Sequence, residues 1–93
     1  MLIGKVLLKA RFWDLYGRIS ITDRQRKVVS RLLEAGPGGF TGGLTTRKYM
    51  GMTKTSRATS YREISDLLDK GLLCQNPGKG RSVSYDLAWP EVD

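Results

Sequence analysis

Apolar and polar residues alternate with the period of a helix over most of the chain, and with the period of a strand near its C-terminal end. The first helix is predicted over residues 2–16 and would end at Gly17. Its second half is strongly apolar, with Phe12, Trp13 and Leu15 close together. Such a surface must pack on the body of the protein or on another chain.

A second helix is predicted over TDRQRKVVSRLLEAG, residues 22–36. Thr22 and Gln25 have the spacing of a capping box, although Asp23 could also serve as the cap. The apolar stripe that would face the core consists of Val28, Val29, Leu32 and Leu33. Gly36 would end this helix because glycine is the preferred residue just past a helix C-terminus.

The stretch GPGGFTGGL, residues 36–44, contains five glycines and has the composition of a phosphate-binding loop. It lacks the Gly-Lys-Ser/Thr ending of such a loop, and no predicted strand precedes it. We therefore interpret it as a flexible connection into the next helix, with Phe40 as an anchor on the core.

Two further helices are predicted after this connection. The first is short, covers TTRKYMGM (residues 45–52), would be capped by Thr45 or Thr46, and would end near Gly51. The second lies within residues 53–71 and would be closed by Gly71. Its possible caps are Thr53, Thr55 and Ser56. A tight turn containing Gly51 would join the two helices, as in a helix-turn-helix.

Two short strands, LLCQN (72–76) and RSVSYDL (81–87), flank the turn Pro77-Gly78-Lys79-Gly80 and predict a β-hairpin. A lone hairpin is only marginally stable in water, so its Val83, Tyr85 and Leu87 face must rest on the helices. The predicted fold is mainly α with a small β-hairpin, a winged helix-turn-helix. We expect a linking or packing helix over 1–17, the winged-helix domain over 18–90, and a tail over 91–93.

The sequence contains sixteen Lys and Arg residues and nine Asp and Glu residues, which gives a net charge of +7 and a pI of about 9.9. A pI this high makes a polyanion such as DNA a candidate partner. The basic residues between Thr41 and Arg62 are Arg47, Lys48, Lys54, Arg57 and Arg62, and no acidic residue lies among them.

Histidine is absent and there is a single cysteine, Cys74. This composition excludes His-based acid–base catalysis, an intrachain disulfide and cysteine metal clusters, so we expect no catalytic residue, no metal and no cofactor. The spacing of Glu63, Asp66 and Asp69 predicts a solvated helix face, not an acid–base pair. Cys74 is expected to be a partly buried thiol, and its isolation fits a reducing cytoplasm. No segment is long and apolar enough for a membrane span.

The predicted DNA-binding residues lie in two cationic places. At the start of the longer helix are Lys54, Thr55, Ser56, Arg57, Ala58 and Tyr61, and in the hairpin turn are Lys79 and Arg81, while Arg47 and Lys48 would steady the DNA backbone. The alternative is that these charges are merely solvated, that Tyr61 is half-buried core, and that Arg62 pairs with Asp66 one turn later.

Residues 12–88 resemble the C-terminal winged-helix domain of many bacterial Fic-family proteins. The matching residues are Arg24, Gln25, Ser56, Thr59, Ser60, Arg62, Glu63, Ile64, Leu67, Gly71, Leu72, Leu73, Gly80, Arg81, Ser82, Tyr85 and Leu87. The chain departs from the family pattern at Ser60, where alanine is usual, and at Glu63-Ile64, where Asp-Leu is commoner.

The resemblance implies a module attached to an enzyme domain that transfers AMP from ATP to a protein hydroxyl. The catalytic histidine of that domain has no counterpart here, so we expect this chain to be a C-terminal fragment and not itself an enzyme. In such proteins the winged helix would bind double-stranded DNA. The alternative is a protein-interaction module that uses Phe12, Trp13 and Leu15 to dock on the missing catalytic domain, on a modification target or on a second copy of itself.

Overall fold

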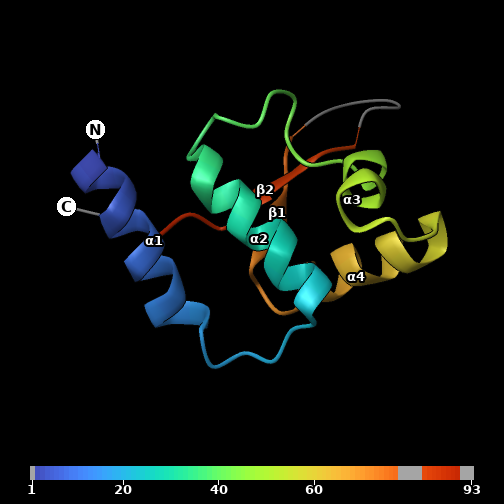
Figure 1. The fold of residues 1–93 in the computed structure, drawn as a ribbon, viewed down its shortest axis with the longest axis horizontal. Coiled ribbons are helices and arrows are strands. Elements are labelled where there is room, and N and C mark those ends of the chain that lie inside the picture. The colour runs from blue at the N-terminus through green and yellow to red at the C-terminus, as the bar shows by residue number, and fades with distance from the viewer. Residues whose placement is uncertain (1, 78–82, 91–93) are drawn as a thin grey trace.

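The computed structural model describes residues 2–77 and 83–90 of the 93-residue chain, with the backbone only for residues 2–6. The described part is mostly helical and adds one small two-stranded antiparallel sheet, as predicted. The element order is α1 (Leu2–Tyr16), α2 (Asp23–Ala35), α3 (Thr46–Thr53), α4 (Arg57–Asp69), β1 (Leu73–Gln75) and β2 (Tyr85–Leu87). Helix α2 lies at the centre, with α1 on one side and α3 and α4 on the other (Figure 1).

The start of α2 follows the predicted capping box. The Thr22 hydroxyl accepts a hydrogen bond from the Gln25 N–H at 3.1 Å, and the Gln25 side chain accepts one from the Thr22 N–H at 2.8 Å. Two of the amides left unpaired at the helix start are thereby satisfied. Gly36 ends the helix with a φ of 78°, a conformation that favours glycine.

The turn between α3 and α4 differs from the prediction. Gly51 lies inside α3, which continues to Thr53, and the chain turns at residues 54–56 instead. The prediction was wrong because Lys54, and not a glycine, takes up the left-handed conformation that ends α3. Ser56 is then the cap of α4, the last of the three candidates.

Strands β1 and β2 pair antiparallel, with Leu73 opposite Leu87. Each is shorter than predicted, and Leu44 adds an isolated antiparallel bridge to Tyr85 that the sequence did not indicate. Tyr85 and Leu87 are buried, but Val83 is 44% exposed because it precedes β2 and does not join the sheet. The expectation that Val83 rests on the helices is therefore wrong.

One apolar core joins all four helices and the hairpin. Its buried side chains are Phe12, Val28, Val29, Leu32, Leu33, Leu44, Tyr49, Ile64, Leu67, Leu72, Leu73, Tyr85 and Leu87. Phe40 is partly buried against this core, as predicted for the anchor of the glycine-rich connection. The core holds α3, α4 and the hairpin against α2, and so fixes the surface on which the predicted site residues lie.

Candidate nucleic-acid interface

An open groove of about 810 Å³ lies between α3, the start of α4 and the β-hairpin. Its lining residues are Thr45, Thr46, Arg47, Arg57, Tyr61, Gln75, Val83 and Tyr85. Three predicted site residues, Arg47, Arg57 and Tyr61, meet here although they belong to two different helices. The groove thus brings the start of α4 beside the described residues of the hairpin, Gln75, Val83 and Tyr85.

The first turn of α4 is built to present its side chains outward. The Ser56 hydroxyl accepts a hydrogen bond from the Thr59 N–H at 3.2 Å, which caps the helix. Because Ser60 is buried on the inner side, Arg57 and Ala58 are exposed, and Tyr61 is 59% exposed. Tyr61 is therefore a surface residue, and the alternative that it belongs to the core is wrong.

The two hydroxyls predicted to contact DNA already have partners. The Thr55 hydroxyl lies 2.9 Å from that of Thr53 and 2.8 Å from that of Ser60, while Ser56 caps α4. These hydrogen bonds shape the turn between the two helices. Among the described residues, the backbone N–H groups of Arg57 and Ala58 have no hydrogen-bond partner, and helix-start amides of this kind suit phosphate oxygens.

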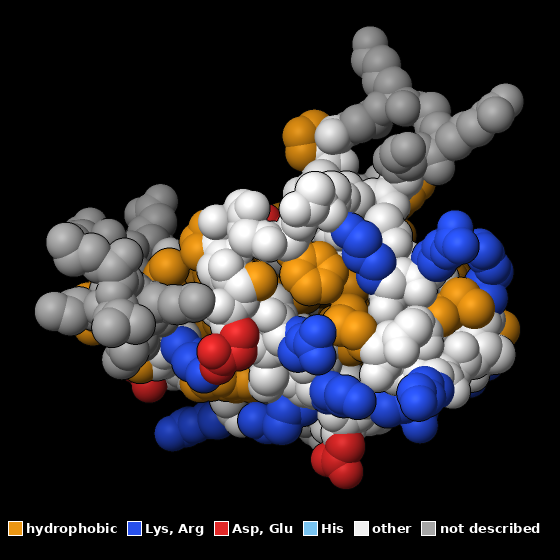
Figure 2. Space-filling view, turned by 45° about the horizontal axis from the view of Figure 1, so that its top comes forward, with side chains coloured by type: hydrophobic (Ala, Val, Ile, Leu, Met, Phe, Trp, Pro, Cys, Tyr) orange, Lys and Arg blue, Asp and Glu red, His pale blue; other side chains and the backbone are white. Residues whose placement is uncertain are grey.

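Arg47 and Arg57 are both exposed, and no carboxylate in the described part of the chain forms an ion pair with either. Figure 2 shows many Lys and Arg side chains over one face of the molecule, with few Asp or Glu side chains between them. Their charge is thus available to an anionic partner.

Lys48, predicted to contact the DNA backbone, has several partners within the chain. Its ammonium group donates hydrogen bonds to the carbonyl oxygens of Thr41 and Gly43, the second at 2.8 Å, and lies 5.2 Å from the centre of the Phe40 ring. These contacts turn the side chain back onto the glycine-rich connection. Lys48 therefore orders residues 40–43 and leaves the neighbouring Arg47 as the exposed cation of α3.

Lys54 is exposed at the turn between α3 and α4, with a φ of 56°. In the described residues it is the one non-glycine side chain at positive φ. A β-carbon in this conformation costs roughly 1–2 kcal/mol, so a glycine here would be less strained. The conformation has a structural cause, because the Lys54 N–H bonds the Met50 carbonyl oxygen and so closes α3.

Replacing Lys54 by glycine is expected to raise the free energy of unfolding by about 0.5–1 kcal/mol. The Lys54→Ala control removes the same charge but keeps the strain, so it should show no such gain in stability. Urea unfolding would measure the difference. A Lys54→Gly variant no more stable than Lys54→Ala would contradict the strain argument.

Sequence reasoning missed a buried polar cluster behind the groove. Glu63 was expected on a solvated face, but it is only 8% exposed. Its carboxylate accepts hydrogen bonds from Arg24, at 3.0 Å from Nε and 2.6 Å from Nη2, and from the Tyr49 hydroxyl at 2.6 Å. The Gln25 side chain also donates to the Glu63 backbone oxygen at 3.0 Å. The cluster ties α2, α3 and α4 together.

The pKa values follow from these contacts. The hydrogen bond from the Arg24 guanidinium is the main cause that holds the pKa of Glu63 below its usual range, while Glu63 raises the pKa of Arg24. Burial, followed by the hydrogen bond to Glu63, raises the pKa of Tyr49.

One feature of the sequence indicates that Glu63 is buried. It lies three residues after Ser60 and directly before Ile64, at the edge of the buried stripe of α4.

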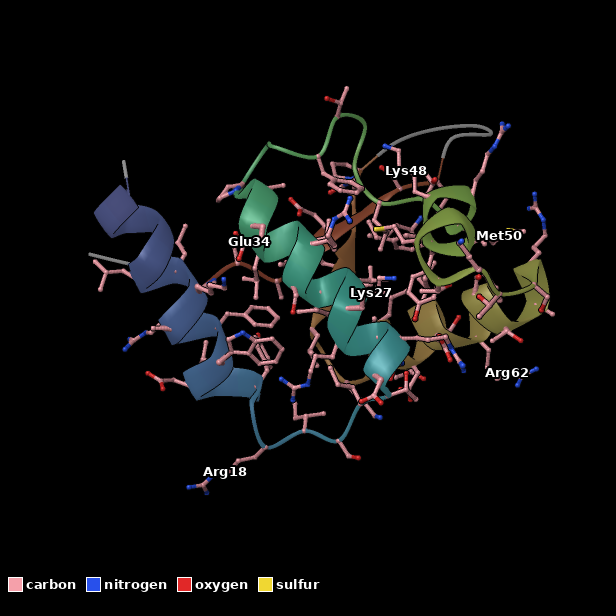
Figure 3. All side chains as sticks on the ribbon, viewed as in Figure 1. Arg18, Lys27, Glu34, Lys48, Met50 and Arg62 are labelled. Atoms are coloured by element: carbon pink, nitrogen blue, oxygen red, sulfur yellow. The ribbon has the colours of Figure 1, made fainter. Side chains whose placement is uncertain are left out.

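Asp66 forms its ion pair with Lys70 and not with Arg62, the partner considered from the sequence. It accepts a hydrogen bond from the Gln25 side chain at 2.9 Å and forms an ion pair with Lys70 at 2.9 Å. The predicted partner, Arg62, instead points away from the body of the protein (Figure 3). The hydrogen bond from Gln25 is the main cause that lowers the pKa of Asp66.

The residues predicted for protein interaction fall in different environments. Phe12 is fully buried among core residues, so it is not available to a partner in this structure. Trp13 is partly buried, with the Arg26 guanidinium 4.7 Å from its ring centre. Leu15 is 56% exposed and, with Leu7, forms the apolar outer surface of α1 in the described residues.

Two further expectations concern the hairpin. Lys79 and Arg81 lie outside the described residues. Cys74, expected to be partly buried, is exposed, because the two-residue period of β1 buries its neighbour Leu73 and turns Cys74 outward.

A metal-binding cluster and a membrane-spanning helix are both absent from the described residues. Among residues 2–77 and 83–90, no group of three or more Cys, Asp or Glu side chains gathers where it could hold a metal ion. None of the helices in this part of the chain has the length and apolar character needed to cross a lipid bilayer. The sequence matches no known family model, and no curated protein is detectably similar to it.

Proposed function

We propose that this chain is a winged helix-turn-helix module that binds double-stranded DNA. The observation that carries the proposal is the meeting of Arg47, Arg57 and Tyr61 beside Val83 of the hairpin in one open groove. In this proposal α3 and α4 form the helix-turn-helix, and β1 and β2 are the described part of the wing. Helix α4 would enter the major groove with its N-terminal residues toward the base edges.

The side chains of this region suit separate tasks on DNA. Arg57 can donate two hydrogen bonds to guanine, which is worth about 1–3 kcal/mol of discrimination. Ala58 is small and apolar, as contact with a thymine methyl group requires. Arg47 and Lys54 are exposed cations that would neutralise phosphates, which contributes affinity without sequence preference.

The test is the salt dependence of binding. The longest dimension of the chain is 36 Å, or about eleven base pairs at 3.4 Å each, so a random duplex of about 20 base pairs is longer than any interface the chain could form along one axis. Replacing Arg47, the groove cation assigned to a phosphate, by alanine should reduce the slope of log affinity against log salt concentration by about 1. Fluorescence anisotropy measures it. An unchanged slope would remove the groove from the interface.

A second candidate function is a protein-interaction module that docks through α1. The observation that favours it is the exposure of Leu7 and Leu15 on the outer side of this helix, at 48% and 56%. A stable dimer in sedimentation that Leu15→Asp abolishes, together with no DNA binding at low salt, would favour this function over the first.

We also propose that the module belongs to a longer Fic-family protein. The support is the resemblance of residues 12–88, and the chain itself has no histidine for AMP transfer. An antibody against this chain should then detect an endogenous protein well above 10.4 kDa that transfers AMP. An endogenous protein of 10.4 kDa would contradict membership of the Fic family and leave the DNA-binding proposal intact.

A further inference from the structure

The outward face of α2 carries a row of cations that the groove does not include. The buried side of this helix is formed by Gln25, Val28, Val29, Leu32 and Leu33. Arg24, Lys27 and Arg31 lie on the opposite side, three and four residues apart, and all are exposed. We call them the α2 strip. Lys27 marks its middle on the ribbon (Figure 3). The strip is about 10 Å long at 1.5 Å per residue, close to three base pairs of duplex.

The charges of the strip are free of neutralising partners except at one end. In the described part of the chain no carboxylate forms an ion pair with Lys27 or Arg31. The acidic residues of α2 are Asp23 at its start and Glu34 near its end, and Glu34 pairs with Lys9 of α1. The middle of the helix therefore presents positive charge alone.

Arg24 is held in place and not simply neutralised. Glu63 binds its Nε and Nη2 atoms, yet the Arg24 side chain remains 48% exposed. A guanidinium has five N–H donors, so the group keeps donors that Glu63 does not use. An arginine fixed by a buried carboxylate loses little side-chain freedom when it binds a phosphate.

The strip and the groove lie on opposite flanks of α4. Arg24 is joined to α4 through Glu63, whereas Tyr61 lines the groove. Residues two apart on a helix point to nearly opposite sides, so Glu63 and Tyr61 mark the two flanks, with Ala58 and Arg62 exposed between them. A helix in the major groove has one DNA strand on each side, about 12 Å apart.

We infer that the α2 strip is a second DNA-backbone contact, which meets one strand of the duplex while Arg47 and the hairpin side of the groove meet the other. This inference rests on the proposed DNA binding and adds to it a two-sided grip. The strip contacts phosphates only, so it adds affinity and salt dependence but no sequence preference.

The test compares the strip variant, its matched control and the groove variant Arg47→Ala/Arg57→Ala on a random duplex of about 20 base pairs. Lys27→Ala/Arg31→Ala removes two charges from the strip, and both residues are exposed, so folding should be preserved. Arg11→Ala/Arg18→Ala is the matched control: it removes two exposed charges from α1 and the segment after it, where Arg18 points away from α4 (Figure 3). Arg24 is left intact because its removal would strand the buried Glu63 carboxylate.

The strip variant should lower the slope of log affinity against log salt by about 2, as two lost phosphate contacts require. The control should leave the slope as it is. If the strip variant behaves like the control while Arg47→Ala/Arg57→Ala still lowers the slope, the strip is not a contact and the groove stands. If the wild-type chain does not bind the duplex at low salt, the DNA-binding proposal itself fails, and the strip falls with it.

Discussion

The Glu63→Ala variant is expected to lose about 2–4 kcal/mol of unfolding free energy, which would lower Tm by roughly 10–20 °C. The ring of Tyr49 is fully buried, and its hydroxyl donates to Glu63 at 2.6 Å. Without Glu63 this buried hydroxyl has no acceptor, and an unpaired buried donor costs about 1–3 kcal/mol. The link from α2 to α4 through Arg24 is lost as well. Thermal unfolding followed by circular dichroism measures the effect.

Tyr49→Phe provides the control for this explanation. It removes the hydroxyl, so the Glu63→Ala/Tyr49→Phe double variant should be more stable than Glu63→Ala alone. If the two substitutions instead destabilise additively, the unpaired hydroxyl is not the main cause of the loss.

The same cluster predicts a pH dependence. Because Arg24 holds the pKa of folded Glu63 below its ordinary value of 4.5, this carboxylate contributes its full stability above pH 4.5. The contribution is lost as the pH falls through the lowered pKa of the folded state. The stability difference between wild type and Glu63→Gln should therefore shrink in acid. A difference that stays constant in acid would contradict the ion pair with Arg24.

Phe12→Ala is expected to lose about 3–5 kcal/mol, the usual cost of removing a buried phenyl ring. Phe12 is fully buried and contacts the rings of Trp13 and Tyr16, with centres 5.4 Å and 4.8 Å away. Among the described side chains of α1, Phe12 is the one that is buried in the common core, and α1 contacts α2. Urea unfolding followed by tryptophan fluorescence, to which Trp13 and Trp89 both contribute, would report the stability.

Leu15→Ala is the matched control, because Leu15 lies on the exposed side of the same helix. It should change stability by no more than about 0.5 kcal/mol. Equal losses in the two variants would show that α1 is not anchored by Phe12. The expected difference would show instead that α1 unfolds together with the part of the protein that carries the groove.

Local patterns in the sequence were sufficient for much of the fold. The cap at Thr22 and the apolar stripe of α2 depend on residues within a few positions, and both are as predicted. The exposure of Arg57 and Ala58 also followed from the period of α4. Predictions of this kind succeed because caps and helix faces depend on residues that are close together in the sequence.

Other features depend on partners far apart in the chain. Glu63 is buried because Arg24, 39 residues earlier, and Tyr49, 14 residues earlier, satisfy its carboxylate. A charged residue without a visible partner is expected on the surface, so the sequence indicated a solvated face. The intrachain contacts of Lys48 were not predicted for a similar reason, since the carbonyl oxygens that accept its hydrogen bonds belong to an irregular segment.

The central claim is that the α3, α4 and hairpin surface binds DNA, and amide chemical shifts test it most directly. A ¹⁵N-labelled chain would be titrated at low salt with a random duplex of about 20 base pairs. We expect the largest shift changes at Arg47, Arg57, Tyr61 and Val83, with smaller changes along the outward face of α2 and none at Leu15. Unchanged spectra, or changes confined to α1, would contradict the account.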